Sequence, residues 1–182
     1  MSATLRIPEP GDYEVIASWV PDAESCLRWA GPRVRFPFSA AELPRLLAVA
    51  DGQSYCLAER AASPLGFGQH WVLKPGGVHL GRIIVSPTAR GRGLGRLLCQ
   101  LLVAQAIAVT GATGVTLRVF RNNAAALSLY SSLGFSAVEA ESSQDVLFMQ
   151  REANTQGGAN GRQPFSSEAS RTSATAASRR SP

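Results

Sequence analysis

A glycine-rich turn between an apolar strand and a long apolar helix constrains this chain more than any other segment. It runs from Val85 to Arg96 with the sequence VSPTARGRGLGR. Glycine lets backbone N–H groups approach an anion without a Cβ in the way, and the positive end of the following helix adds to the attraction. The segment therefore predicts a binding site for a phosphate or pyrophosphate group.

Two common nucleotide-binding motifs do not fit this turn. A Walker A loop has Lys followed by Ser or Thr after its last glycine, whereas Gly95 is followed by Arg96 and Leu97. A dinucleotide-binding turn has the spacing GxGxxG and an acidic residue about 20 positions later, where this chain has glycines 111 and 114. Because glycine-rich turns also occur for purely structural reasons, the function has to rest on a second motif.

The hydrophobic pattern alternates between strand and helix periods on both sides of the turn. It predicts strands at 5–7, 54–59, 66–74, 78–85, 114–120, 135–140 and 145–150. It predicts helices at 12–20, 39–50, 93–110 and 123–133, with Asp12 near an N-cap and Ser39 and Glu42 at capping-box spacing. The order βααβββαβαββ indicates an α/β (α+β) fold with a mixed, mostly antiparallel sheet of about six or seven strands and helices on both faces.

Composition indicates one domain and excludes several kinds of partner. The chain has 182 residues, of which 45% are hydrophobic, enough for one core within residues 1–151. Residues 152–182 are rich in Ser, Ala, Gly, Thr and Arg, which predicts a disordered low-complexity tail. The net charge of +5 is spread over both parts, so we expect no nucleic-acid partner.

The same composition indicates a cytoplasmic protein. The longest apolar stretch, Leu97–Val109, is far shorter than the roughly 20 residues that a membrane span needs, so we expect no membrane partner. No apolar run typical of a secretory signal follows Met1. Cys26, Cys56 and Cys99 are odd in number and widely spaced, which favours reduced structural thiols and no metal site.

A second motif makes the turn specific. The turn contains Arg90-x-x-Gly93-x-Gly95, and residues 117–135 read LRVFRNNAAALSLYSSLGF. In this order and spacing, the two motifs resemble the signatures of the GCN5-related N-acetyltransferase (GNAT) family, in its bacterial form. The resemblance is strong over residues 54–149 and loose over the first 50.

The resemblance implies that acetyl-CoA is the co-substrate and that no metal takes part. It implies that the backbone of Ile83, Ile84 and Val85 pairs with the pantetheine arm as an added strand. Asn123 matches the family position that contacts the same arm. The pyrophosphate would be held by the turn, which consists of Arg90, Gly91, Arg92, Gly93, Leu94, Gly95 and Arg96.

The resemblance also implies the catalytic groups. Tyr130 matches the tyrosine that protonates the departing thiolate, and it would contact the coenzyme as well. His79 stands six residues before Val85, where many members carry a carboxylate base, and an imidazole could accept the proton of the amine. Glu59, His70 or a chain of waters are the alternatives for the base, and Cys99 is expected in the core.

These expectations describe an N-acetyltransferase that moves an acetyl group to a primary amine by direct attack in a ternary complex. The acceptor is either a small-molecule amine or an amine of a protein or peptide, and the enzyme is a monomer or a homodimer. Residues 29–32 and 35–38 either wall the acceptor pocket or pack a loop, with packing favoured. The alternative is a non-catalytic acyl-CoA-binding sensor or docking module, which would not require Tyr130.

Overall fold

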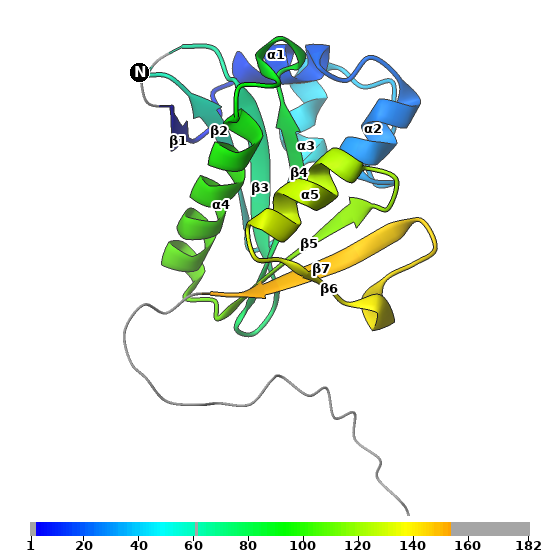
Figure 1. The fold of residues 1–182 in the computed structure, drawn as a ribbon. Coiled ribbons are helices and arrows are strands. Elements are labelled where there is room, and N and C mark those ends of the chain that lie inside the picture. The colour runs from blue at the N-terminus through cyan, green and yellow to red at the C-terminus, as the bar shows by residue number, and fades with distance from the viewer. Residues whose placement is uncertain (1–2, 61, 154–182) are drawn as a thin grey trace, which may run out of the picture.

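The computed structural model describes residues 3–60 and 62–153, which form a seven-stranded sheet with helices on both faces (Figure 1). The strand order across the sheet is β1-β2-β3-β4-β5-β7-β6. All neighbouring strands in the described residues run antiparallel except β4 and β5, which are parallel. The strands are β1 (Thr4–Arg6), β2 (Gly52–Ala58), β3 (Gly66–Lys74), β4 (Gly77–Val85), β5 (Gly114–Phe120), β6 (Ser136–Ala137) and β7 (Val146–Glu152). The predicted fold class is confirmed.

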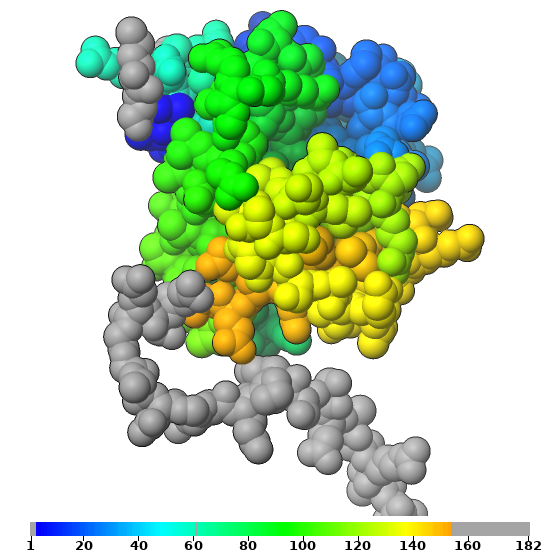
Figure 2. All heavy atoms as spheres, in the orientation of Figure 1, coloured from blue at the N-terminus to red at the C-terminus, as the bar shows by residue number. Residues whose placement is uncertain are grey.

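The helices divide between the two faces of this sheet. They are α1 (Asp12–Ser18), α2 (Ala23–Ala30), α3 (Leu43–Leu46), α4 (Leu94–Thr110) and α5 (Ala124–Ser132), with 3₁₀ turns at 40–42, 87–89 and 139–141. The helices α4 and α5 cover one face, and their atoms lie side by side in Figure 2. Arg96 of α4 donates a hydrogen bond to Ser132 of α5. The helices α1 to α3 pack over part of the other face.

Each face has its own apolar core. On α4, Leu98, Leu102 and Ala106 recur every four residues and are fully buried against the sheet. Their strand partners include Val78 and Leu80. The second core lies under α1 to α3 and includes Ile16, Leu43 and Phe67. Because β4 contributes alternate residues to both cores, it is fixed from both sides, and a site built on it is rigid.

The segment before β2 differs most from the predicted pattern. The helix α2 was not predicted, although Asp22 caps it by accepting a hydrogen bond from the Ser25 amide at 2.7 Å. The predicted capping box at Ser39 and Glu42 is present, but the helix after it is one short turn that ends at Leu46.

Asp12 also differs from its predicted place as a cap. Gly11 is the N-cap of α1, and Asp12 is the first helical residue. The carboxylate of Asp12 accepts hydrogen bonds from the Arg6 guanidinium and from the Glu9 amide, so it joins β1 to α1.

The C-terminal strands differ from the prediction in length. The predicted strand at 135–140 is reduced to β6, because a 3₁₀ turn follows it, whereas β7 extends to Glu152. Most of the predicted tail, residues 154–182, lies outside the described residues, so the boundary near residue 151 stays a prediction. Within the described part of the chain, no helix is long and apolar enough to cross a membrane.

Candidate active site

The sheet opens between its two parallel strands. The pairing of β4 with β5 starts at Gly77 and Gly114 and ends at Leu80 and Leu117, so the rest of each strand diverges. In β4 this leaves residues 81–85 paired only with β3. Their free backbone edge can accept an extended ligand as an additional strand.

A pocket of about 550 Å³ lies at this opening. Its walls come mainly from β4, β5, α5 and residues 27–33, which run from the end of α2 into the following loop, with further residues from β3 and β7. Four predicted site residues line it: His79 and Ile83 from β4, Asn123 from the N-cap of α5, and Tyr130 from within α5. The fold therefore brings together residues that are up to 51 positions apart in the chain.

His79 is buried with one ring nitrogen engaged. Its Nδ1 lies 2.8 Å from the Oγ1 of Thr116 on β5. The Thr116 hydroxyl donates to the Val78 carbonyl at 3.4 Å, so the hydroxyl accepts from His79 and the proton of the neutral ring sits on Nδ1. This arrangement leaves Nε2 with a free lone pair.

The rings around His79 hold its plane and lower its basicity. Trp71 lies against it with ring centroids 4.8 Å apart, and Phe148 stacks on it at 6.2 Å. Burial, together with the nearby charge of Arg118, lowers the pKa of His79 to about 4. The imidazole is therefore neutral at pH 7, as a proton acceptor must be.

Tyr130 is buried on the other side of the opening. It lies in the core under α4 and packs edge-on against Phe135. Burial raises the pKa of its phenol above the ordinary value, and the nearby Cys99 raises it further. The phenol is therefore protonated at neutral pH, as a proton donor must be.

Cys99 lies in the core, as expected. Its side chain is 1% exposed, and burial raises the pKa of its thiol to about 12. A thiol that stays protonated is a poor nucleophile, so Cys99 is unsuited to forming an acyl intermediate.

The glycine-rich turn begins α4 as predicted. Gly91 and Gly93 both have φ of +76°, a conformation that is costly for other residues, and Gly93 is the N-cap of α4. A Cβ added at either position would meet nothing within 4 Å, so both glycines are there for backbone conformation and leave the space outside them open. No side chain caps the N-terminus of α4, which leaves its first amides available to an anion.

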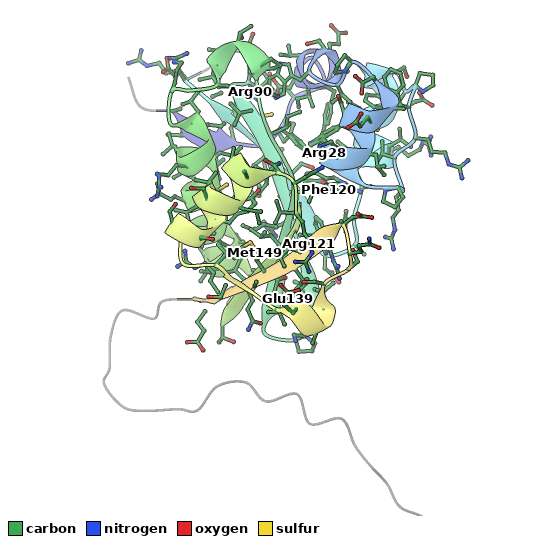
Figure 3. All side chains as sticks on the ribbon, turned by 45° about the vertical axis from the view of Figure 1, so that its right-hand side comes forward. Arg28, Arg90, Phe120, Arg121, Glu139 and Met149 are labelled. Atoms are coloured by element: carbon green, nitrogen blue, oxygen red, sulfur yellow. The ribbon has the colours of Figure 1, made fainter. Side chains whose placement is uncertain are left out.

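The arginines of the turn differ in how they are held. Arg90 and Arg92 are exposed, and Arg90 makes one weak contact to the Val85 carbonyl at 3.4 Å. Arg96 donates to the Ser132 hydroxyl at 2.7 Å, which ties α4 to α5. In Figure 3, Arg90 lies at the end of the molecule away from Glu139.

The predicted site residues fall into two groups. His79, Ile83, Asn123 and Tyr130 line the pocket, whereas Ile84, Val85 and residues 90–96 lie along the path from it to the start of α4. Neither alternative base lines the pocket. Glu59 directly follows the last residue of β2, and His70 stacks on Tyr55. Asn123 also caps α5 by accepting from the Ala126 amide.

Several residues in the pocket wall or directly behind it were not predicted from the sequence. Thr116 and Phe148 are on strands whose pairing brings them beside His79, and strand alternation on 114–120 could have indicated Thr116. Trp29 has both of the roles that were considered for residues 29–32, as a wall of the pocket and as a packing residue. It lines the pocket, and its Nε1 donates to the Arg82 carbonyl at 2.8 Å.

No group of three or more His, Cys, Asp or Glu side chains that could hold a metal ion occurs in the described residues.

Sequence relatives point to one family of enzymes. The Acetyltransferase (GNAT) family matches residues 19–135, which is more than half of the chain. A mycothiol acetyltransferase of Gordonia bronchialis is 44% identical over 91 residues, covering 47% of this chain and 28% of that relative. The chain thus spans less than a third of the length of that relative.

Solved structures share the fold. A spermidine N-acetyltransferase from Vibrio cholerae in complex with CoA and spermine superposes with a TM-score of 0.69 and 19% identity, over 83% of this chain and 95% of that chain. A GNAT phosphinothricin acetyltransferase from Sinorhizobium meliloti in complex with AcCoA superposes with a TM-score of 0.65 and 23% identity, over 84% of this chain and 89% of that chain. Together with the family match and the turn, these likenesses establish that the chain belongs to the Acetyltransferase (GNAT) family.

Proposed function

We propose that this chain is an acetyl-CoA-dependent N-acetyltransferase that works at the opening between β4 and β5. The observation that carries the proposal is the placement of a proton donor and a proton acceptor, Tyr130 and His79, on the wall of one pocket. The anion-binding turn begins α4 at the end of the same strand, β4. The complexes of two structural relatives with CoA and AcCoA support the choice of co-substrate.

Acetyl-CoA fits the features of the opening from its phosphates to its acetyl group. The turn from Arg90 to Arg96 would bind the pyrophosphate through backbone amides and the positive end of α4. The pantetheine arm would pair with the free edge of residues 83–85, beside Asn123. The thioester would then reach the pocket, which also has to hold the acceptor.

The transfer would take place by direct attack of the amine on the thioester. The amine nitrogen forms a bond to the acetyl carbon while the carbon–sulfur bond breaks. The departing sulfur takes the proton of the Tyr130 hydroxyl, because the same burial that raises the pKa of the phenol also disfavours a free thiolate.

The nitrogen must lose a proton in the same sequence of steps. A base whose pKa is about 4 cannot deprotonate an alkylammonium with a pKa near 10 before attack, so the acceptor would react as the free amine, after its ammonium proton has passed to water. The nitrogen becomes far more acidic once it has bonded to the acetyl carbon, and Nε2 of His79, directly or through water, would take its proton at that stage. The Tyr130 hydroxyl is then restored by proton exchange with solvent.

The experiment is a calorimetric titration with acetyl-CoA, followed by thiol release against a panel of amines and peptides. We expect binding by the wild type and loss of binding in Gly93→Glu, which places a negative side chain at the turn. Gly111→Glu is the matched control, because Gly111 has a φ of +64° at the other end of α4 and equally open surroundings. Equal affinity in all three proteins would overturn the pyrophosphate site. Binding without thiol release for every acceptor would favour the non-catalytic sensor instead.

A further inference from the structure

The pocket is lined by four arginines and by no acidic residue. The arginines are Arg28, Arg33, Arg82 and Arg118. Three ion pairs occur in the described residues, and they join Arg6, Arg45 and Arg121 to carboxylates elsewhere. The pocket therefore has a positive potential that no carboxylate on its wall offsets.

A bulge in β4 turns Arg82 toward the side of the sheet on which His79 lies. Two residues of β4, Arg82 and Ile83, lie opposite the single residue Gly68 of β3, and Arg82 has a φ of +53°. Without the extra residue, Arg82 would alternate to the face covered by α4. Instead, its guanidinium contacts α3 and Gln69 on the His79 side.

The hydrogen bonds of Arg82 go to neutral groups. One guanidinium nitrogen, Nη1, donates to the Leu47 carbonyl and to Oε1 of Gln69, each at 2.7 Å. These bonds orient the group and leave its charge without a counterion. Burial lowers the pKa of Arg82, and the nearby charge of Arg33 lowers it further.

An anion in the pocket would relieve this unfavourable arrangement. A partly buried cation without a counterion costs free energy, and a second cation nearby adds to the cost. A carboxylate or phosphoryl group between two guanidinium groups removes both contributions and gains charge-assisted hydrogen bonds.

The other two arginines are already engaged. Arg28 donates to the Asn122 side chain at 3.0 Å and lies 5.0 Å from the Phe120 ring centroid, beside which it is drawn in Figure 3. Arg118 lies over the Phe148 ring at 5.0 Å. Arg82 and Arg33 are thus the pair best suited to a ligand.

We propose that the acceptor is a small molecule that carries an anionic oxygen group beside its amine, and that Arg82 and Arg33 bind this group. This inference rests on the proposed acetyl transfer. His79 and Arg82 are three residues apart on one strand, at most about 10 Å along it. The anion and the nitrogen that receives the acetyl group therefore fit within one small molecule. A polyamine would place additional positive charges against the arginines and is excluded as the preferred acceptor.

The test compares matched pairs of amines by thiol release from acetyl-CoA. One pair is an α-amino acid and its carboxamide, and the other is 2-aminoethyl phosphate and ethanolamine. We expect kcat/KM to be roughly 10- to 100-fold higher for the anionic member of at least one pair, as for the loss of one charge-assisted contact. The pair with the larger ratio distinguishes a carboxylate from a phosphoryl group. A neutral member or spermidine as the preferred substrate would overturn the proposal.

Variants locate the effect. Arg82→Met is expected to reduce the ratio to about threefold or less while the rate with the neutral member falls little. Arg33→Met, at an exposed position, gives the same test if Arg82→Met unfolds. Arg35→Met is the matched control, because Arg35 is exposed nearby and does not line the pocket. An unchanged ratio in both pocket variants would refute the role of these arginines.

A binding measurement separates this proposal from acetyl transfer itself. Propanoate and propyl phosphate, which lack an amine, are titrated into the protein in the presence of CoA. Binding of one of them that is lost in Arg82→Met supports the anion site even if no amine tested releases thiol. If neither propanoate nor propyl phosphate binds and anionic amines are not preferred, the anion site is overturned. If only acetyl transfer fails, the result counts against the proposed function.

Discussion

Replacing Thr116 with valine tests how the structure holds His79 as a proton acceptor. The hydroxyl of Thr116 accepts from Nδ1 at 2.8 Å in a buried place, and valine has nearly the same shape without an acceptor. The variant leaves a buried N–H without a partner, which costs about 1–3 kcal/mol. The ring can avoid this cost by moving its proton to Nε2.

The expected result is a shift of the tautomer with a loss of turnover. If the proton moves to Nε2, the free lone pair proposed to accept the proton of the nitrogen is lost, and we expect kcat to fall roughly 10- to 100-fold, as for 1.4–2.8 kcal/mol. The affinity for acetyl-CoA should not change, because Thr116 is not among the residues that line the pocket. Thr116→Ser, which keeps the hydroxyl, should retain most of the activity.

The assay is nitrogen-15 NMR of the imidazoles together with steady-state kinetics. The chain has only two histidines, so His70→Gln assigns both sets of signals. The wild type should show His79 protonated on Nδ1, and Thr116→Val should show Nε2 protonation. A wild-type ring protonated on Nε2, or a valine variant with unchanged tautomer and turnover, would refute the reasoning.

Two further predictions concern packing and stability. Gly81→Ala would place its Cβ 2.4 Å from Trp71, so the indole, which also lies against His79, has to shift. We expect a raised KM for the acceptor and a loss of about 1–3 kcal/mol in stability, and an unchanged KM and melting temperature would argue against this contact. Asp12→Asn should cost about 2 kcal/mol in urea unfolding at pH 7, because it breaks a largely buried pair with Arg6. The hydrogen bond from Arg6 lowers the pKa of Asp12 in the folded protein below its usual 3.8. This stabilisation is therefore present above about pH 4 and is lost as the pH falls through the pKa of the folded state. A stability difference between variant and wild type that stays constant down to about pH 2 would contradict this prediction.

Local signals in the sequence were enough to predict the sheet and the turn. The β-branched run at 114–120 forms β5 with the predicted bounds, and the predicted turn from Val85 to Arg96 leads into α4. These features depend on residues that are close together in the sequence, so the local pattern of residue types is enough to predict them. Tyr130 and Asn123 could be proposed as site residues because they recur within one short motif.

The rest of the site depends on contacts between distant segments. Arg82 precedes the arginines of the turn by only eight residues, yet a one-residue bulge directs its side chain to Gln69 and Leu47 on the His79 side of the sheet. No pattern of hydrophobic residues predicts such a bulge. The helix α2 was missed for a related reason. It is only eight residues long, and its place is set by the cap at Asp22 and by packing against β4.

The most direct test of acetyl transfer at this opening is the turnover of Tyr130→Phe measured at saturating acetyl-CoA. Phenylalanine keeps the ring that fills the core and removes only the hydroxyl that would protonate the departing sulfur. We predict that kcat falls about 100-fold or more while the calorimetric affinity for acetyl-CoA stays within a factor of about three. Unchanged kcat in a folded variant would contradict the assignment of Tyr130 as the acid.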